Sequence, residues 1–209
     1  MKFYDCSTAP SPRRVRMFLA EKKLDMETVQ IDLRNGEQFS DAFRAINPDC
    51  TVPVLELDDG TCLTEVFAIC QYLEDEFPAH SMFGRNAIEA ALATQWNIKI
   101  EQQGLAAIAE SIRNYAGGFK GRALTGPTDY EQIPALAERG RRRAAEFFRT
   151  LDAQLARHTF IAGEQFTIAD ITAMVFTDFA AWIKLELPDD AHNLRRWKTL
   201  VAERPSASV

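Results

Sequence analysis

The stretch Asn47–Glu76, NPDCTVPVLELDDGTCLTEVFAICQYLEDE, decides the fold of this chain. Two short apolar runs flank the turn Asp58-Asp59-Gly60, and such runs divided by Asp-Gly predict a β-hairpin. Thr64 follows the second run as a candidate helix N-cap. The apolar residues that recur at helical spacing after it are Val66, Ile69, Cys70 and Leu73. The stretch therefore predicts a loop with a Val-Pro pair, a hairpin and a capped helix.

The residues before this stretch predict a strand, a helix and a second strand. Lys2–Cys6 reads as the first strand, and Ser11 with Pro12 predicts a helix start, because Ser is a good N-cap and Pro is preferred at the first helical position. Thr28–Leu33 alternates apolar and polar residues, which is typical of a strand. Strand, helix and strand in so short a span imply a parallel pair joined by a crossover helix. With a short helical stretch before Asn47, the order is βαβαββα.

Beyond residue 77 the sequence predicts a linker and then helices alone. The linker, 78–86, has no periodicity and contains turn-forming residues. Thr167 and Asp170 form a variant capping box at one helix start. The other expected helices run from about Ala87 to Asn114, from about Tyr130 to Arg157, and around Leu194, Trp197 and Leu200. We therefore predict an α/β domain at 1–77 and an all-helical domain at 87–209.

Composition excludes several classes of function. The 209 residues carry a net charge of −6, with 46% hydrophobic and 26% charged residues, as in an ordinary globular protein. This charge argues against nucleic acid or an anionic membrane as a partner, and the run 139–143, RGRRR, is expected to be a solvated helix face. The four cysteines and three histidines show no zinc spacing, and no Gly-rich phosphate loop is present. We expect a cytoplasmic protein with reduced thiols and neither metal nor nucleotide, without a signal peptide or membrane span.

These motifs resemble the glutathione transferase superfamily along essentially the whole chain, with a bacterial-type, theta-like first domain. The residues that carry the resemblance are Gln38-Phe39-Ser40-Asp41-Ala42-Phe43, Asn47-Pro48, Val52-Pro53, Glu65-Val66 and the Thr167 box. The resemblance implies a thioredoxin-like first domain, an all-α helical bundle as the second, and a homodimer. It also implies glutathione as co-substrate.

The resemblance assigns the glutathione contacts along the first domain. Val52, flanked by Thr51 and followed by a cis Pro53, is expected to exchange backbone hydrogen bonds with the cysteinyl residue of glutathione. Gln38 stands where the family has a histidine that contacts the glycyl end. A neutral amide still donates a hydrogen bond but brings no charge, and a plain surface glutamine is the alternative.

The resemblance places the γ-glutamyl end of glutathione at the helix that follows the hairpin. Glu65 is expected to receive the γ-glutamyl ammonium, although an acid at a helix start is also ordinary dipole chemistry. Val66 replaces the serine whose hydroxyl usually binds the γ-glutamyl carboxylate, which leaves only its backbone N–H. Losing one hydrogen bond to a charged group weakens binding by about tenfold.

The group that activates the thiol is open at this point. A free cysteine thiol has a pKa of about 8.5, so the enzyme must stabilise the thiolate. The theta-like pattern puts the catalytic serine on Ala9, and the candidates are therefore Ser11, which also reads as an N-cap, and Ser7. Arg14 and Arg16 are expected at most to add positive field. Some family members activate the sulfur through water held by the helical domain, for which the matching residues here are Ser111, Asn114 and Tyr115.

The electrophile pocket is expected between the two domains, on an apolar face of the first long helix. Its expected lining residues are Ile108, Ser111, Ile112, Asn114 and Tyr115. This face favours a transferase that conjugates glutathione to small hydrophobic electrophiles. A glutathione-dependent peroxidase or disulfide reductase needs the same site. Ala9 and Val66 favour the third alternative, a non-catalytic glutathione-binding regulatory protein.

Overall fold

The computed structural model describes all 209 residues, which form two compact units. The first, here the α/β unit, comprises Met1–His80, Thr125–Thr128 and Val209. The second, here the helical unit, comprises Ser81–Leu124 and Asp129–Ser208. The sequence placed the whole of 87–209 in one helical domain and did not anticipate that Thr125–Thr128 pack with the α/β unit.

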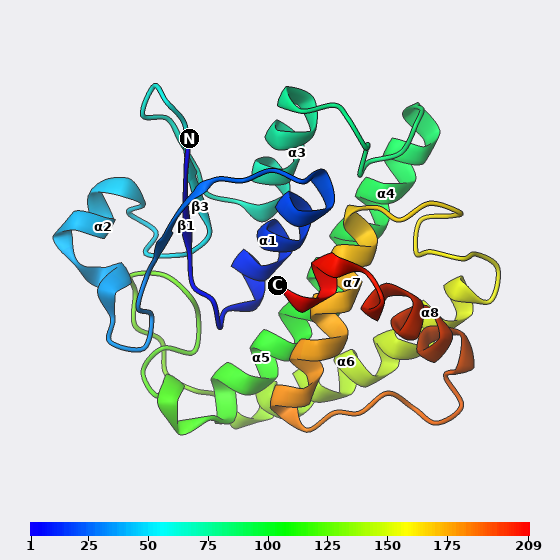
Figure 1. Ribbon diagram of the computed structural model, residues 1–209. Coiled ribbons are helices and arrows are strands. Elements are labelled where there is room, and N and C mark those ends of the chain that lie inside the picture. Colours follow the sequence, from blue (N-terminus) through cyan, green and yellow to red (C-terminus); the bar gives the residue numbers. More distant parts are fainter. The chain divides into compact units, whose positions relative to one another are not determined.

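The α/β unit has the predicted order βαβαββα (Figure 1). Its elements are β1 (Lys2–Asp5), α1 (Pro10–Lys22), β2 (Glu27–Gln30), a 3-10 turn (Glu37–Phe39), α2 (Asp41–Ile46), β3 (Val54–Glu56), β4 (Cys62–Leu63) and α3 (Val66–Glu76).

One four-stranded sheet, in the order β2-β1-β3-β4, organises this unit. β1 and β2 are parallel, with Asp5 opposite Gln30, as the crossover helix requires. β3 runs antiparallel to both β1 and β4, and Leu55 stands opposite Leu63. The predicted hairpin is therefore confirmed. Tyr4, Phe43 and Val54 are buried together on the sheet, where they form part of the core.

The start of α1 differs from the prediction that Ser11 caps this helix. Ala9 is the N-cap, and its N–H donates to the Cys6 carbonyl at 2.9 Å in the turn that precedes the helix. The helix begins at Pro10 because the fixed φ of proline suits the first helical position and its missing N–H costs nothing there. Ser11 is thus the second residue of α1, and its hydroxyl caps nothing.

The start of α3 is also shifted by one residue from the prediction. Glu65, in extended conformation, is the N-cap in place of Thr64, and its side chain makes no capping hydrogen bond. The predicted apolar stripe is confirmed: the buried residues of α3 are Val66, Ile69, Cys70 and Leu73. Burial of this stripe fixes the rotation of α3, which packs beside α1, since apolar area removed from water drives packing.

The helical unit contains the predicted helices in the predicted order (Figure 1). They are α4 (Ala87–Lys99), a π-helical segment (Ile100–Leu105), α5 (Ala106–Tyr115), α6 (Pro134–Leu155), α7 (Ile168–Phe179) and α8 (His192–Ala202), with 3-10 turns at Gly117–Phe119, Ala180–Ile183 and Pro205–Ser208. The single helix expected from about Ala87 is therefore continuous to Tyr115, with a π-helical interruption that the sequence did not indicate. No helix in the chain combines the length and apolarity that crossing a membrane requires.

Close backbone packing holds α5 against α6. A Cβ atom at Gly140 of α6 would lie 2.5 Å from the Ala107 carbonyl oxygen, so only glycine permits this approach. Arg139 and Arg143 of α6 both pair with Glu110 of α5, the second at 2.9 Å. The arginine run is therefore on a helix face, as expected, but two of its members bind the neighbouring helix instead of only solvent.

The predicted capping box at α7 is confirmed and extends into the core. Asp170 is fully buried, and its Oδ2 accepts the Thr167 N–H at 2.9 Å. Its Oδ1 accepts the Ile161 N–H at 2.9 Å and the Trp197 indole N–H at 2.8 Å. One carboxylate therefore joins the loop before α7, the start of α7 and the middle of α8. Burial raises the pKa of Asp170 to about 6, against the opposing effect of these donors.

We expect Asp170 to make stability depend on pH. The pKa of Asp170 is about 6 in the folded state and has its ordinary value of 3.8 in the unfolded state. Between these two values the folded protein keeps the proton on Asp170, whereas the unfolded protein has lost it. Stability from this group is fully present below about pH 4 and is lost as pH rises to about 6, by on the order of 3 kcal/mol. The measurement is urea unfolding from pH 3.5 to 7 in wild type and Asp170→Asn.

The Asp170→Asn variant supplies the control, because it has the same shape and no titration. We expect it to be less stable by about 1–3 kcal/mol at pH 7, since its amide cannot accept all the donors. The difference in stability between the two proteins should change between pH 4 and 6. A difference that stays constant over this range would contradict a raised pKa.

Candidate functional site

An open main-chain edge lies at one end of the β3–β4 hairpin. The peptide bond between Val52 and Pro53 is cis, and Val52 directly precedes β3. The backbone hydrogen bonds of the protein include neither the N–H nor the C=O of Val52. Since Leu55 pairs with Leu63, residues just before β3 and just after β4 lie at the same end of the hairpin. The pairing therefore brings Val52 and Glu65 to one place.

Asn47 holds the loop that leads into this edge. Its buried Nδ2 donates to the Thr51 carbonyl at 2.9 Å and to the Thr51 hydroxyl at 3.0 Å, and its Oδ1 accepts the Asp49 N–H at 3.0 Å. Its own carbonyl accepts the Cys50 N–H at 3.0 Å, and Cys50 has a left-handed φ of 54°. With both carbonyl and hydroxyl of Thr51 turned to Asn47, the position of Val52 is fixed from one side. No pattern in the sequence predicted this role of the Asn47 side chain.

The other side of the edge is the start of α3. The Glu65 side chain is exposed, with no ion pair to any basic group of the protein. An anionic group is thus presented to solvent beside the unsatisfied N–H groups of a helix start. Val66 points into the core instead. The arrangement suits a ligand with a cation for Glu65 and an anion for the helix start.

Gln38 belongs to the 3-10 turn before α2. The residue is buried, and its Oε1 has no hydrogen-bond partner. Buried polar atoms are nearly always paired, so this one stands out. The alternative of a plain surface glutamine is therefore wrong, while contact with a ligand stays a prediction.

The loop between β1 and α1 and the first turn of α1 carry the hydroxyls of the predicted catalytic residues. Ser7 is exposed, and its N–H donates to Gln30 Oε1 at 2.9 Å. Ser11 is half-buried at the second position of α1, with its hydroxyl 3.5 Å from Arg14 Nη2. Pro10 and Pro12 have no N–H, so Ser11 supplies the first N–H of the helix. The position of the expected serine is the N-cap Ala9, which offers no side-chain donor.

A tyrosine hydroxyl close to this loop is not available as an alternative. Tyr4 donates its hydroxyl proton to Glu56 Oε2 at 2.6 Å. Burial, followed by this hydrogen bond, raises the pKa of Tyr4 to about 12. Tyr4 therefore stays neutral at physiological pH and is engaged within the sheet.

The five residues expected to line an electrophile pocket all lie on α5, and four are buried: Ile108, Ser111, Ile112 and Asn114. The Ser111 backbone N–H faces α6, where a Cβ at Gly140 would approach it to 2.7 Å. Tyr115, the fifth, is 54% exposed. Only Tyr115 thus presents a large surface, and the role of the others stays a prediction.

Asn114 and Tyr115 are both engaged within the helical unit. The Asn114 Nδ2 donates to the Glu110 carbonyl at 2.8 Å, and its Oδ1 accepts the Ile133 N–H at 2.9 Å. The Tyr115 hydroxyl lies 3.4 Å from the Trp182 carbonyl, to which it donates. Asn114 therefore ties the residue before α6 to α5, a contact that spans 19 positions and that no local pattern indicates.

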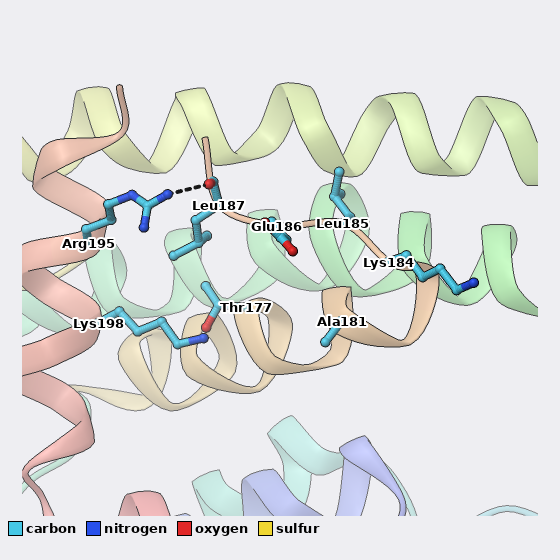
Figure 2. A pocket seen from close by; sticks show the side chains of 8 residues that line it. All are labelled: Thr177, Ala181, Lys184, Leu185, Glu186, Leu187, Arg195 and Lys198. Atoms are coloured by element: carbon cyan, nitrogen blue, oxygen red, sulfur yellow. Dashed lines mark hydrogen bonds between the residues drawn. The ribbon is translucent and has the colours of Figure 1, made fainter. Parts of the chain in front are cut away.

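A pocket of about 740 Å³ lies elsewhere in the helical unit (Figure 2). None of the predicted site residues is among those that line it, which are Thr177, Ala181, Lys184, Leu185, Glu186, Leu187, Arg195 and Lys198. Figure 2 shows Arg195 reaching the Leu187 carbonyl, at 2.7 Å. Arg195 also pairs with Asp189 at 3.0 Å, and Lys198 pairs with Asp178 at 2.9 Å. Two of the three cations that line this pocket are thus engaged in ion pairs.

No group of three or more His, Cys, Asp or Glu side chains is arranged to hold a metal ion. The candidate site of the α/β unit offers main-chain groups at Val52, the free carboxylate of Glu65 and the hydroxyls of Ser7 and Ser11. Groups of these kinds can pair with the backbone and the charged ends of a small peptide.

Comparison with known protein families gives two matches. Residues 8–76 match the family model of the glutathione S-transferase N-terminal domain. Residues 109–205 match that of the glutathione S-transferase C-terminal domain. Together they cover most of the chain, including the hairpin, α3 and the capping box of α7.

Individual relatives agree with these matches. Glutathione S-transferase 2 of Saccharomyces cerevisiae is 32% identical over 209 residues, which cover 99% of this chain and 87% of that protein. Glutathione S-transferase GstA of Escherichia coli O157:H7 is 30% identical over 189 residues, which cover 90% of this chain and 86% of that protein.

Solved structures show the same fold over the full length. The crystal structure of a glutathione S-transferase domain-containing protein of Marinobacter aquaeolei has a TM-score of 0.91 at 37% identity, covering 99% of this chain and 100% of that one. The crystal structure of Gtt2 from Saccharomyces cerevisiae also has a TM-score of 0.91, at 32% identity, covering 100% and 99%. These matches over the full length show that this chain belongs to the glutathione S-transferase family and is a glutathione transferase.

Proposed function

We propose that this transferase conjugates the thiolate of reduced glutathione to small hydrophobic electrophiles. The observation that carries the proposal is the unpaired backbone of Val52 at the same end of the hairpin as the unpaired carboxylate of Glu65. Glutathione has a peptide backbone, an ammonium and two carboxylates, so it matches both groups. The resemblance noted in the sequence adds Thr51, Pro53 and Gln38 to the proposed contacts.

Each part of glutathione has a proposed partner with a physical reason. The cysteinyl residue pairs with Val52 as a short added strand, in which main-chain bonds supply affinity whatever the side chain. The γ-glutamyl ammonium pairs with Glu65, a charge-assisted bond worth roughly 1.5–3 kcal/mol. The γ-glutamyl carboxylate meets the N–H groups at the start of α3, without the help of a hydroxyl at Val66.

The thiolate is proposed to lie near the start of α1. Ser11 is the better candidate for stabilising it, because its hydroxyl is not used for capping and its N–H is the first of the helix. Ser7 is the second candidate. A charge-assisted hydrogen bond to sulfur lowers the thiol pKa and so raises the thiolate fraction at neutral pH.

The apolar nature of the electrophile is supported by exposed aromatic surface on the helical unit. Tyr115 is held by the Trp182 carbonyl, and the Trp182 ring packs on Phe179 with a centroid separation of 5.1 Å. Two half-exposed aromatic rings in fixed positions favour an apolar or aromatic substrate. A glutathione-dependent peroxidase would use the same groups.

We also propose that the enzyme is a homodimer. Its cytoplasmic location stays a prediction from the sequence. α4 exposes three large apolar side chains, Ile88, Leu92 and Ile98, whose exposed fractions are 73%, 39% and 41%. Ile88 and Leu92 lie one turn apart on the same face of the helix, and exposed apolar side chains that lie together support a contact with another chain.

We expect purified protein to bind glutathione in calorimetry and to turn over an aryl halide. Glu65→Gln should raise the glutathione Kd by at least about tenfold, since it removes the charge that pairs with the γ-glutamyl ammonium. Glu76→Gln, the same change at an exposed residue at the other end of α3, is the control and should leave the Kd unchanged. Binding without turnover of the aryl halide would contradict the proposed reaction, and turnover of an organic hydroperoxide alone would favour the peroxidase.

Ser11→Ala tests the source of thiol activation. We expect kcat/KM to fall by roughly 10- to 100-fold, the value of one hydrogen bond to a charged group, with Tm changed little because Ser11 does not cap α1. Ser7→Ala is the matched comparison on the other side of Ala9. A loss of activity in Ser7→Ala alone would move the role to Ser7, and full activity in both variants would exclude both hydroxyls.

The dimer is tested by light scattering on wild type and Ile88→Asp/Leu92→Asp. We expect wild type at micromolar concentration to have about twice the chain mass of 23.6 kDa, and the variant to have the mass of one chain. Leu200→Asp, at an exposed apolar residue of α8, is the control and should stay dimeric. A wild-type protein with the mass of one chain would contradict the proposal.

A further inference from the structure

Three polar side chains that contact one another and the β1–α1 loop have no part in the proposed function: Asp5, Arg16 and Gln30. Asp5 ends β1 and is only 1% exposed. Its Oδ1 accepts Arg16 Nη1 at 2.6 Å, and its Oδ2 accepts Gln30 Nε2 at 2.6 Å. The parallel pairing of β1 with β2 places Gln30 beside Asp5, and α1 brings Arg16 to the same point. Both oxygens of the carboxylate are therefore occupied.

Both partners of Asp5 reach on to the backbone of the loop. Arg16 donates to the Cys6 carbonyl at 3.3 Å and to the Ser7 carbonyl at 3.0 Å. Gln30 accepts the Ser7 N–H at 2.9 Å. The peptide group between Cys6 and Ser7 is thus held at its C=O and at its N–H, and the next peptide group is held at its C=O.

These contacts set the direction in which the loop presents its groups. In a trans peptide the C=O and N–H point in opposite directions, so a Ser7 carbonyl turned toward Arg16 turns the Thr8 N–H away from it. The Cys6 carbonyl also accepts the Ala9 N–H, which closes the turn into α1. The start of α1 and the Ser7 hydroxyl are therefore placed by the same network.

The chemistry of the network indicates that it orients the loop backbone, and that it neither adds much to the stability of the fold nor supplies a positive electric field. A buried ion pair gains little stability over an apolar pair, because both charges lose their hydration. Its charge is also cancelled, since Arg16 pairs with Asp5, and this corrects the expectation that Arg16 adds positive field. What remains specific is the planar guanidinium, whose fork of donors matches three acceptors in fixed directions.

We propose that Asp5, Arg16 and Gln30 are positioning residues that hold the thiol-activating loop of this transferase. The proposal rests on the proposed function, because it assigns to the network the orientation of the groups that stabilise the glutathione thiolate. Displacing such groups by about 1 Å costs on the order of 100-fold in rate, whereas glutathione is bound mainly by Val52 and Glu65.

The test uses Arg16→Lys, which keeps the charge and loses the planar fork, and Gln30→Met, which removes the amide at similar length. The pKa of the bound glutathione thiol is read from thiolate absorbance against pH, beside kcat and KM. We expect both variants to raise this pKa by about one unit and to lower kcat at least roughly tenfold, with KM for glutathione within about twofold of wild type.

Glu27→Gln is the matched control. Glu27 lies on β2, and its carboxylate pairs with Lys2 at 3.8 Å on the exposed side, away from the loop. It should leave the thiol pKa and kcat unchanged. Variants of Arg16 and Gln30 that lower Tm but keep the wild-type thiol pKa and kcat would overturn the proposal, because the network would then be structural only.

Failure of the proposed function gives a different result. If the wild-type protein binds no glutathione, the proposed function is wrong. The effect of the network on the loop is then measured by amide hydrogen exchange. Loss of the hydrogen bond to Gln30 should speed exchange at the Ser7 amide by about tenfold in Gln30→Met. Unchanged exchange at Ser7 would overturn the positioning role as well.

Discussion

The antiparallel pairing of β3 with β4 is the constraint on which the site depends. It carries the chain from Val52 into the sheet and back to Glu65, so that an open main-chain edge and a free acid meet at one end of the hairpin. Two supports fix that end. The side-chain amide of Asn47 donates to the Thr51 carbonyl and hydroxyl and so holds the loop before Val52, and the buried stripe of α3 fixes the helix that follows Glu65. Recognition by main chain tolerates many side chains, because the groups that bind are common to all residues.

Both helix starts at the site lack the side-chain hydroxyl that their position favours. α1 follows Ala9 and α3 begins with Val66, so neither offers a hydroxyl at the point where the family resemblance predicts one. The anionic parts of glutathione are then left to backbone N–H groups and to neighbouring residues. Contacts that fix the backbone are therefore important at this site, because a main-chain N–H, unlike a side chain, cannot rotate toward its acceptor. The network around Asp5 is such a device on the α1 side.

The helical unit uses a few long-range contacts to hold its helices. Asp170 joins three segments through one buried carboxylate, Gly140 lets the backbones of α5 and α6 approach, and Asn114 ties the loop before α6 to α5. Buried polar groups of this kind are costly unless every one is satisfied, so they select one arrangement of the helices. A defined aromatic surface at Tyr115 follows from a rigid frame.

The sequence by itself determined the order of the elements, the hairpin, the buried stripe of α3 and the capping box of α7, because each is set by local spacing that the chain carries within a few residues. It also named Val52 and Glu65 through a motif. Only the tertiary structure decided where α1 and α3 begin, since a backbone turn from Cys6 to Ala9 and the end of strand pairing at Leu63 outweighed the capping preference of Ser11 and Thr64. It alone decided the partners of Asp5, Asn114 and Glu110, and the packing of Thr125–Thr128 with the α/β unit. These contacts join residues far apart in the chain, and such pairs leave no period or spacing by which they can be read.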